Sequence, residues 1–145
     1  MDLGIFDHLD RRDMPVHDFY EHRLRLLEKY DAAGFYSYHL AEHHATPLGL
    51  APVPGIFLAA ATQRTRRIRL GPCVYCLPLY DPLRLIEEVC MLDQLSGGRF
   101  DFGVGRGIVR PRAFAVLTLI TSSNFEGCSM GRSAGLTPLR ILSTK

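Results

Sequence analysis

The stretch Ser96–Gly107, which reads Ser-Gly-Gly-Arg-Phe-Asp-Phe-Gly-Val-Gly-Arg-Gly, constrains this chain more than any other part of its sequence. Two consecutive glycines, Gly97 and Gly98, supply the positive φ that closes a helix. Residues 100–104 then alternate apolar with polar or small side chains, which is the period of a strand. The strand leads to Arg106, whose guanidinium stands between two glycines and is suited to a flat or phosphorylated ligand. A helix, a turn, a strand and a ligand-facing loop in this order predict an α/β protein.

The rest of the first 107 residues repeats this alternation of strand and helix signals. We expect strands at residues 3–7, 35–40, 68–77 and 100–104, and helices at about 15–33, from 52 or 54 to 65, and 81–96. Short connections in this order require parallel strands and right-handed crossovers. The sequence therefore predicts either a doubly wound sheet or a barrel.

Capping residues and apolar spacing define the helices. Gly34 is expected to stop the first helix, and Asp81 followed by Pro82 is an N-cap with proline at the first helical position. Several apolar residues of the third helix are expected to face inward. They are Leu83, Ile86, Val89, Cys90 and Leu95.

The sequence changes character after Gly107. Serine and threonine provide nine of the last 38 residues but only five of the first 107. Neither helical nor strand periodicity is evident over residues 108–145, and Glu126 is their only acidic residue. We therefore divide the chain into residues 1–107, a partial α/β domain, and residues 108–145, an irregular tail that we expect to be poorly ordered.

Charge and hydropathy narrow the classes of function. The chain has 145 residues, of which 47% are hydrophobic, and a net charge of +2, so it is typical of one globular protein. So small a charge gives no reason to expect nucleic acid as a partner. The longest apolar run, residues 113–120, is too short to span a bilayer, and no basic, apolar leader is evident. We expect a cytoplasmic protein that binds neither nucleic acid nor membranes.

Four motifs follow the strands in a fixed order. They are Glu42-His43-His44 after the second strand, Leu77-Pro78 with Asp81-Pro82 after the third, the sequence Leu-Asp-Gln-Leu-Ser-Gly-Gly-Arg at residues 92–99, and Gly-Val-Gly-Arg-Gly at residues 103–107. Together they resemble the bacterial-luciferase-like flavin monooxygenases, with matching order and spacing over residues 1–107. Members of that family fold as (β/α)8 TIM barrels. The resemblance therefore implies the N-terminal half of such a barrel, with about four parallel strands, followed by the irregular tail.

The resemblance implies an oxidoreductase, a flavin-dependent monooxygenase that acts with molecular oxygen on a small organic substrate. The implied cofactor is reduced FMN supplied by a partner flavin reductase, and some relatives use a deazaflavin instead. The resemblance assigns His43 to proton transfer or to positioning the oxygen chemistry, Cys73-Val74 to a cis peptide under the flavin ring, and Arg106 to the flavin phosphate. The candidate catalytic residues are His43 and His44, and the candidate cofactor-binding residues are Cys73, Val74, Gly105, Arg106 and Gly107. Parallel strands would bring His43 and Arg106 to the same edge of the sheet.

The resemblance ends after four strands, whereas a complete barrel of eight strands needs roughly 250 residues. We therefore expect a truncated member of the family, and its activity as a separate chain is left open. One alternative is a half barrel without catalysis that associates with itself as a homodimer. The outer strands of an incomplete sheet favour this alternative because their backbone groups lack partners.

A second alternative is a zinc hydrolase, since His39-Leu-Ala-Glu42-His43 fits the H-x-x-E-H pattern. That chemistry needs both histidines on one face of a helix, four residues apart. On a strand, positions four apart are about 13 Å from each other, which is too far for one ion to bind both. Cys73-Val-Tyr-Cys76 lacks the second cysteine pair of a zinc site. We therefore assign no metal ligands and interpret both thiols as structural.

Overall fold

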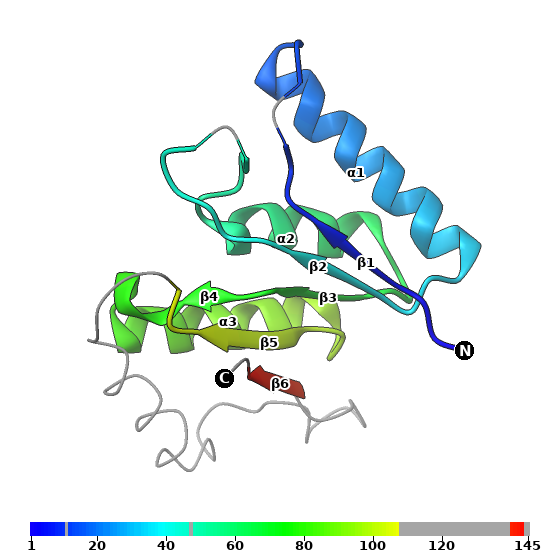
Figure 1. Ribbon diagram of the computed structural model, residues 1–145. Coiled ribbons are helices and arrows are strands. Elements are labelled where there is room, and N and C mark those ends of the chain that lie inside the picture. Colours follow the sequence, from blue (N-terminus) through cyan, green and yellow to red (C-terminus); the bar gives the residue numbers. More distant parts are fainter. Residues whose placement is uncertain (11, 47, 108–139, 144–145) are drawn as a thin grey trace.

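The computed structural model describes residues 1–10, 12–46, 48–107 and 140–143. Strands and helices alternate along residues 1–107, as the sequence predicts (Figure 1). In chain order the elements are β1 (Gly4–Asp7), α1 (Val16–Ala33), β2 (Ser37–Leu40), α2 (Pro54–Arg64), β3 (Arg69–Pro72), β4 (Tyr75–Cys76), the short 3-10 helix η1 (Leu77–Leu79), α3 (Pro82–Ser96), β5 (Asp101–Gly105) and β6 (Arg140–Ser143).

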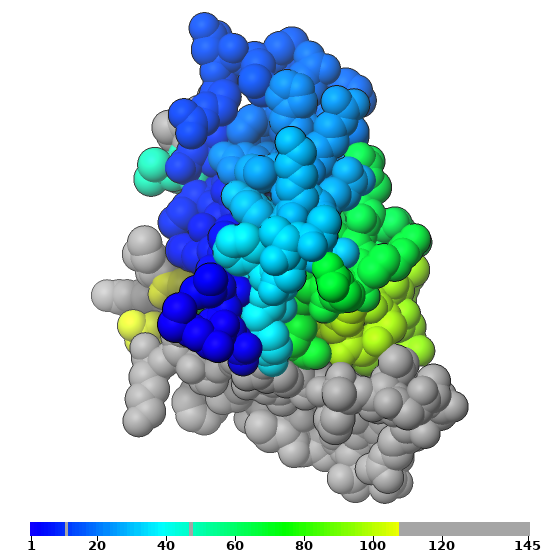
Figure 2. All heavy atoms as spheres, turned by 90° about the vertical axis from the view of Figure 1, so that its right-hand side faces the viewer, coloured from blue at the N-terminus to red at the C-terminus, as the bar shows by residue number. Residues whose placement is uncertain are grey.

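All the paired strands run parallel, in two three-stranded sheets with the orders β1-β2-β3 and β4-β5-β6. A parallel bridge between Leu70 and Phe100 joins β3 to the start of β5, so the two sheets continue into one another. Helices α1, α2 and α3 lie on one face of the strands (Figure 1), and Figure 2 shows atoms of α1 at the surface beside green and yellow-green atoms of later segments. This is the arrangement of part of a (β/α) barrel, and no closed barrel forms within the described residues.

The helix ends follow the capping signals in the sequence. Helix α1 ends at Gly34, whose φ of 83° is left-handed. Helix α3 begins after Asp81, whose carboxylate accepts the N–H groups of Leu83 and Arg84, both at 3.1 Å. It ends at Gly97, whose φ of 67° is also left-handed. A residue without a side chain adopts this backbone region at least cost, so the predicted helix ends are confirmed.

The buried face of α3 differs from the predicted one. Leu83 is 64% exposed and Leu95 is 47% exposed, although both were expected to face inward. Leu85, Val89 and Leu92 are buried instead, and of these only Val89 was predicted. The prediction failed because apolar side chains occur around most of the circumference of α3. Apolar spacing alone therefore does not decide which face packs against α2 and the strands.

The predicted third strand, residues 68–77, is divided in two. Strand β3 ends at Pro72, β4 begins at Tyr75, and the peptide bond between Cys73 and Val74 is cis. The resemblance led us to expect a cis peptide at this position, and its presence is confirmed. The 3-10 helix η1, which was not predicted, follows β4 directly and leads to the N-cap of α3.

Strand β6 lies in the segment for which we predicted no regular structure. It pairs with β5, with Asp101 opposite Arg140 and Val104 opposite Ser143, so β5 has a partner on each side. Strand β1 pairs only with β2 among the described residues and forms one edge of the sheet. The predicted disorder of residues 108–139 lies outside the described residues. None of the described helices combines the length and the apolar character needed to cross a membrane.

Candidate functional site

The carboxyl ends of the strands lie along one edge of the structure. The last residues of β1, β2 and β3 are partners in the sheet register, as are the last residues of β4 and β5. Because the strands are parallel, the segments that follow them gather at this edge, which we call the rim. His43, after β2, and Arg106, after β5, both belong to it. The rim comprises residues 8–9, 41–46, 48–50, 73–80 and 106–107.

Glu42 is the polar centre of the rim, and its side chain is fully buried. Its carboxylate accepts three hydrogen bonds, from Nε2 of His44 at 2.7 Å, the hydroxyl of Tyr80 at 2.8 Å and the N–H of Cys76 at 3.1 Å. A buried carboxylate needs such donors because it has given up its water. Glu42 thereby ties the segment after β2 to β4 and η1. In the sequence, Glu42 was evident only as a member of the Glu42-His43-His44 motif and of the H-x-x-E-H pattern, and neither indicated that its carboxylate would be buried.

The surroundings of Glu42 keep two neighbouring acidic groups protonated. Burial, together with the negative charge of Glu42, raises the pKa of the Cys76 thiol to about 11. The same two causes raise the pKa of the Tyr80 hydroxyl. Since the thiolate is the nucleophilic form of cysteine, Cys76 remains a neutral, unreactive thiol near pH 7. This agrees with the interpretation of Cys76 as structural.

His43 pairs with a histidine that the sequence analysis did not single out. Nδ1 of His8 lies 3.1 Å from Nε2 of His43, and the two rings stack with their centroids 5.3 Å apart and their planes 20° from parallel. His44, the other predicted catalytic histidine, is exposed and turns to Glu42 instead. His8 was visible in the sequence only as a polar residue after the first strand. Its position after a parallel strand was the one available signal that it would reach the rim.

Two residues next to the rim histidines have unusual backbone conformations. Leu9, which follows His8, has a φ of 51°, and Ala45, which follows His44, has a φ of 52°. Left-handed backbone costs roughly 1–2 kcal/mol for a residue with a side chain. Such conformations concentrate at functional sites, where the surrounding structure holds them in place. They mark the segments after β1 and β2 as candidates for a function.

The predicted cofactor-binding residues occupy two neighbouring segments of the rim. Cys73 and Val74 form the cis peptide after β3, and the N–H of Cys73 donates to the carbonyl of Leu40 at 2.8 Å. Both Cys73 and Cys76 are free, half-buried thiols. The register that pairs Cys76 with Gly105 brings the second segment beside the first.

Arg106 is the cation of the second segment. It is exposed, and it makes no ion pair or hydrogen bond with any other described residue. It stands directly after β5, and the chain then turns at Gly107, which has a φ of 61°. An unpaired guanidinium presents a planar set of donors that matches a phosphate group. The rim thus offers a group for a phosphate at one place and imidazole rings at another, which fits FMN.

The alternative metal site is not favoured by the partners of its side chains. No group of three or more histidine, cysteine, aspartate or glutamate residues is placed to hold a metal ion in the part of the chain that the structure describes. In the H-x-x-E-H segment, Glu42 is enclosed by its three donors, and His43 pairs with a second histidine. His39 lies within β2.

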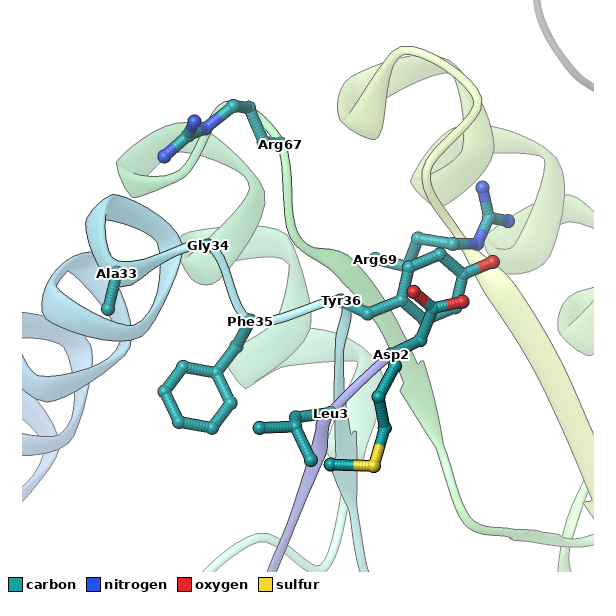
Figure 3. Close-up of a pocket in the computed structure, with 9 residues that line it drawn as sticks. Asp2, Leu3, Ala33, Gly34, Phe35, Tyr36, Arg67 and Arg69 are labelled. Atoms are coloured by element: carbon teal, nitrogen blue, oxygen red, sulfur yellow. The ribbon is translucent and has the colours of Figure 1, made fainter.

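A pocket of about 340 Å³ lies at the other, amino-terminal end of the strands (Figure 3). It is lined by residues 1–3 and 33–36 together with Arg67 and Arg69, whose guanidinium groups point in opposite directions (Figure 3). Both cations are bound within the protein. Arg67 donates at 2.7 Å to a backbone carbonyl at the end of α1, and Arg69 donates at 2.7 Å to the carboxylate of Asp101. None of the predicted site residues lines this pocket.

Comparisons with known proteins agree with the sequence motifs. The family model described as "luciferase-like monooxygenase" matches residues 1–114. The uncharacterized protein y4wF of Sinorhizobium fredii is 56% identical over 105 residues, which are 72% of this chain and 31% of that protein. The oxygenase component of the flavin-dependent trigonelline monooxygenase of Acinetobacter baylyi is 30% identical over 109 residues, which are 74% of this chain and 30% of that protein.

A solved structure gives the same result for the fold. The oxygenating constituent of 3,6-diketocamphane monooxygenase from Pseudomonas putida, a type II Baeyer-Villiger monooxygenase in complex with FMN, superposes with a TM-score of 0.70 and 26% sequence identity. The match covers 78% of this chain and 31% of that one. The chain therefore spans about a third of the length of each of these three proteins.

Proposed function

The chain belongs to the luciferase-like monooxygenase family, as its motifs predicted, and from this premise we propose that its rim is part of the site of a flavin-dependent monooxygenase. The reaction that we propose uses molecular oxygen to oxidise a small organic substrate. One observation supports this most directly: the segments after β2 and β5 bring His43 and Arg106, which has no partner among the described residues, to the same edge of parallel strands. In α/β barrels, this is the edge at which ligands bind.

The proposed cofactor is reduced FMN, supplied by a partner flavin reductase in the cytoplasm. The relative named as an oxygenase component and the solved structure in complex with FMN support this choice. When bound, FMN would supply the electrons that activate oxygen. Arg106, flanked by Gly105 and Gly107, would hold its phosphate, and the segment at Cys73 and Val74 would lie against its ring.

The residues of the chain itself would perform three tasks. Arg106 would bind the phosphate through charge-assisted hydrogen bonds, which are roughly twice as strong as neutral ones. His43 would accept or deliver a proton at its free ring nitrogen. Glu42 would keep the segments after β2 and β4 together by its three hydrogen bonds, and it would orient His44. The substrate pocket and the complete reaction belong to the proposal, because the chain covers only 31% of the relative that binds FMN.

A flavin titration tests the proposed function. The fluorescence of FMN is followed while the full chain is added, and binding is expected to quench it. Arg106→Ala is expected to weaken binding about 10- to 100-fold, because a hydrogen bond to a charged group contributes about 1.5–3 kcal/mol. A parallel titration with a deazaflavin establishes which of the two cofactors binds more tightly.

Arg84→Ala is the matched control. The side chain of Arg84 is 82% exposed in the first turn of α3, and among the described residues it forms an ion pair only with Glu87, at 3.2 Å. Its removal should leave the dissociation constant for FMN unchanged. The proposed function would lose its support if the wild-type chain bound no flavin, or if Arg106→Ala and Arg84→Ala bound it equally well.

Self-association of a half barrel is the second candidate, and two observations favour it. Strand β1 is an edge with unpaired backbone groups among the described residues, and Phe6, which β1 contributes, is 53% exposed. A second chain could cover both. Sedimentation at several protein concentrations tests this: a homodimer predicts a mass of twice 16.3 kDa that falls on dilution, and a constant monomer mass would contradict it.

A further inference from the structure

We propose that His8 and His43 form a two-histidine proton relay, in which His8 exchanges with solvent the protons that His43 takes from or gives to a ligand at the rim. The inference rests on the proposed function in one respect, which is the assignment of proton transfer to His43. It adds His8, which neither the family motifs nor the sequence analysis assigned to the site.

The facing nitrogens must play opposite parts. Nδ1 of His8 and Nε2 of His43 are 3.1 Å apart, which is the distance of a hydrogen bond. A neutral imidazole carries its proton on one of its two nitrogens. One facing nitrogen therefore donates and the other accepts. The outer nitrogens, Nε2 of His8 and Nδ1 of His43, have no partner among the described residues.

Two neutral arrangements of the pair satisfy this bond, and three coupled proton movements, in which one proton enters the pair, one crosses it and one leaves it, convert one arrangement into the other. In the first, Nε2 of His43 donates to Nδ1 of His8, and the second proton is on Nε2 of His8. A proton that arrives at Nδ1 of His43 allows the Nε2 proton to pass to His8, and the Nε2 proton of His8 leaves to water. In total, one proton enters at His43 and one leaves from His8. Both rings remain neutral, and each ring now carries its proton on its other nitrogen. The reverse sequence delivers a proton to the ligand.

The chain holds His8 in this position through Asp7 and Leu9. One carboxylate oxygen of Asp7 accepts the N–H of Leu9 at 3.0 Å, and the other accepts the hydroxyl of Tyr38 at 2.8 Å and pairs with Arg23 at 3.3 Å. Burial and the nearby charge of Asp7 raise the pKa of Tyr38, so its hydroxyl remains a donor. The left-handed φ of 51° at Leu9 turns the chain directly after His8. Leu9 is fully buried, which fixes this turn.

The loop after β2 holds His43 against His8. The N–H of Leu50 donates to the carbonyl of Leu9 at 3.0 Å, so this loop is tied to the segment that carries His8. Gly49 covers the pair closely: a Cβ on this residue would lie 2.9 Å from Cβ of His43 and 3.1 Å from the carbonyl oxygen of His8. A side chain at position 49 would therefore push the two rings apart. This gives a way to break the relay without removing either histidine.

The pair is also accessible, as a relay requires. His8 and His43 are both half-buried, so neither ring is sealed in the core. The ring of Phe6 meets the ring of His8 edge-on, with centroids 4.7 Å apart, and Phe6 itself is 53% exposed. A proton at the outer nitrogen of either ring can thus exchange with water or with a ligand at the rim.

Nitrogen NMR of the full chain, with ¹⁵N-labelled histidine, tests the relay without any flavin. Under mildly alkaline conditions, where an imidazole is ordinarily neutral, the wild-type chain is expected to show intermediate shifts at the two facing nitrogens. The ¹⁵N chemical shift of one facing nitrogen should move toward the value of a protonated ring nitrogen, and that of the other should move by the same amount toward the value of an unprotonated one. His8→Gln should abolish this complementarity and change the tautomer of His43. Gly49→Ala should abolish it with both histidines in place, and His17→Gln on α1 should leave it intact.

The spectrum of the wild-type chain alone can overturn the proposal. If both facing nitrogens carried a proton, or neither did, the hydrogen bond would not exist. If each ring kept a single fixed tautomer, the pair would be a structural contact and not a relay. A chain that shows the shared proton but binds no flavin would refute the proposed function and leave the relay standing. A chain that binds flavin but keeps fixed tautomers at His8 and His43 would refute the relay and leave the proposed function standing.

Discussion

The rim and the opposite end of the strands use polar side chains in different ways. We call that opposite end the base (residues 1–3, 31, 33–36, 62–69 and 96–101). At the base, the carboxylate of Asp31 accepts the backbone N–H groups of Arg66, Arg67 and Ile68 at 2.9, 2.8 and 2.6 Å. Arg99 is half-buried, and its guanidinium is surrounded by acceptors. It donates to the carbonyls of Thr62, Thr65, Ile68 and Ser96 and to the hydroxyl of Thr65.

The rim leaves comparable groups free. Arg106 makes no hydrogen bond or ion pair with the described residues, and His8 and His43 each keep one ring nitrogen without a partner there. Backbone strain is also confined to this end, at Leu9 and Ala45, since these are the described residues other than glycine with a positive φ. Side chains at the base are therefore used to hold the strands and their connections together, whereas the rim, under the proposed function, has polar side chains free to bind a ligand. Substitutions at the base should therefore lower the free energy of unfolding, whereas substitutions at the rim should mainly weaken ligand binding.

The largest effect on stability is expected at the base. Asp31→Ala leaves three backbone N–H groups without an acceptor and should lower the free energy of unfolding by about 3 kcal/mol. Arg106→Ala, at the rim, should change it by less than about 0.5 kcal/mol. Urea unfolding followed by circular dichroism measures both. Equal losses in the free energy of unfolding for the two variants would contradict the difference between the base and the rim.

The pH dependence of stability should show the same asymmetry. Burial acts to raise the pKa of Asp31, but its hydrogen bonds with three backbone N–H groups outweigh burial and lower that pKa below the ordinary 3.8. The unfolded chain then binds a proton at higher pH than the folded chain. The stabilisation by Asp31 is therefore complete well above pH 3.8 and is lost as the pH falls below it toward the folded-state pKa.

A series of urea unfolding curves across this acidic range checks the prediction. Asp31→Asn should be less stable than the wild-type chain near neutral pH, and the gap should narrow as the solution is acidified. A gap that stays constant down to the lowest pH at which the chain folds would show that the charge of Asp31 contributes nothing.

The smallest effect is expected from relieving strain at the rim. Ala45 is exposed and left-handed, so Ala45→Gly should raise the free energy of unfolding by about 0.5 kcal/mol, after the entropy of the unfolded glycine is counted. Ala60 is exposed within helix α2, and Ala60→Gly there should lower it by about 1 kcal/mol. A rise in the free energy of unfolding for Ala45→Gly together with a fall for Ala60→Gly would show that the backbone is strained at Ala45. A loss at both positions would contradict it.

The helix ends and the order of the elements could be predicted from the sequence. Gly34, Asp81 and Gly97 mark helix ends by local chemistry, and the alternation of strands and helices follows from apolar periods. These signals act within a few residues, so a single sequence contains them. The cis peptide after Cys73 was expected only through the family resemblance, because no local residue preference indicates it.

Features that depend on segments far apart in the sequence escaped prediction. The pairing of His8 with His43 needs two loops to meet at the rim, and the burial of Glu42 needs donors from Cys76 and Tyr80. The outward positions of Leu83 and Leu95 depend on which face of α3 packs against its neighbours. Sequence periodicity describes each element separately, and it does not describe how elements combine.

The central claim is that a flavin binds at the rim and not at the base, and amide NMR of the full chain with added FMN tests it most directly. Added FMN is expected to change the amide chemical shifts of residues 73–76 and 103–107 and of His8 and His43. The amide shifts of residues 1–3 and 33–36 are expected to stay unchanged. Shifts confined to the residues around the pocket of the base, or none anywhere in the chain, would contradict it.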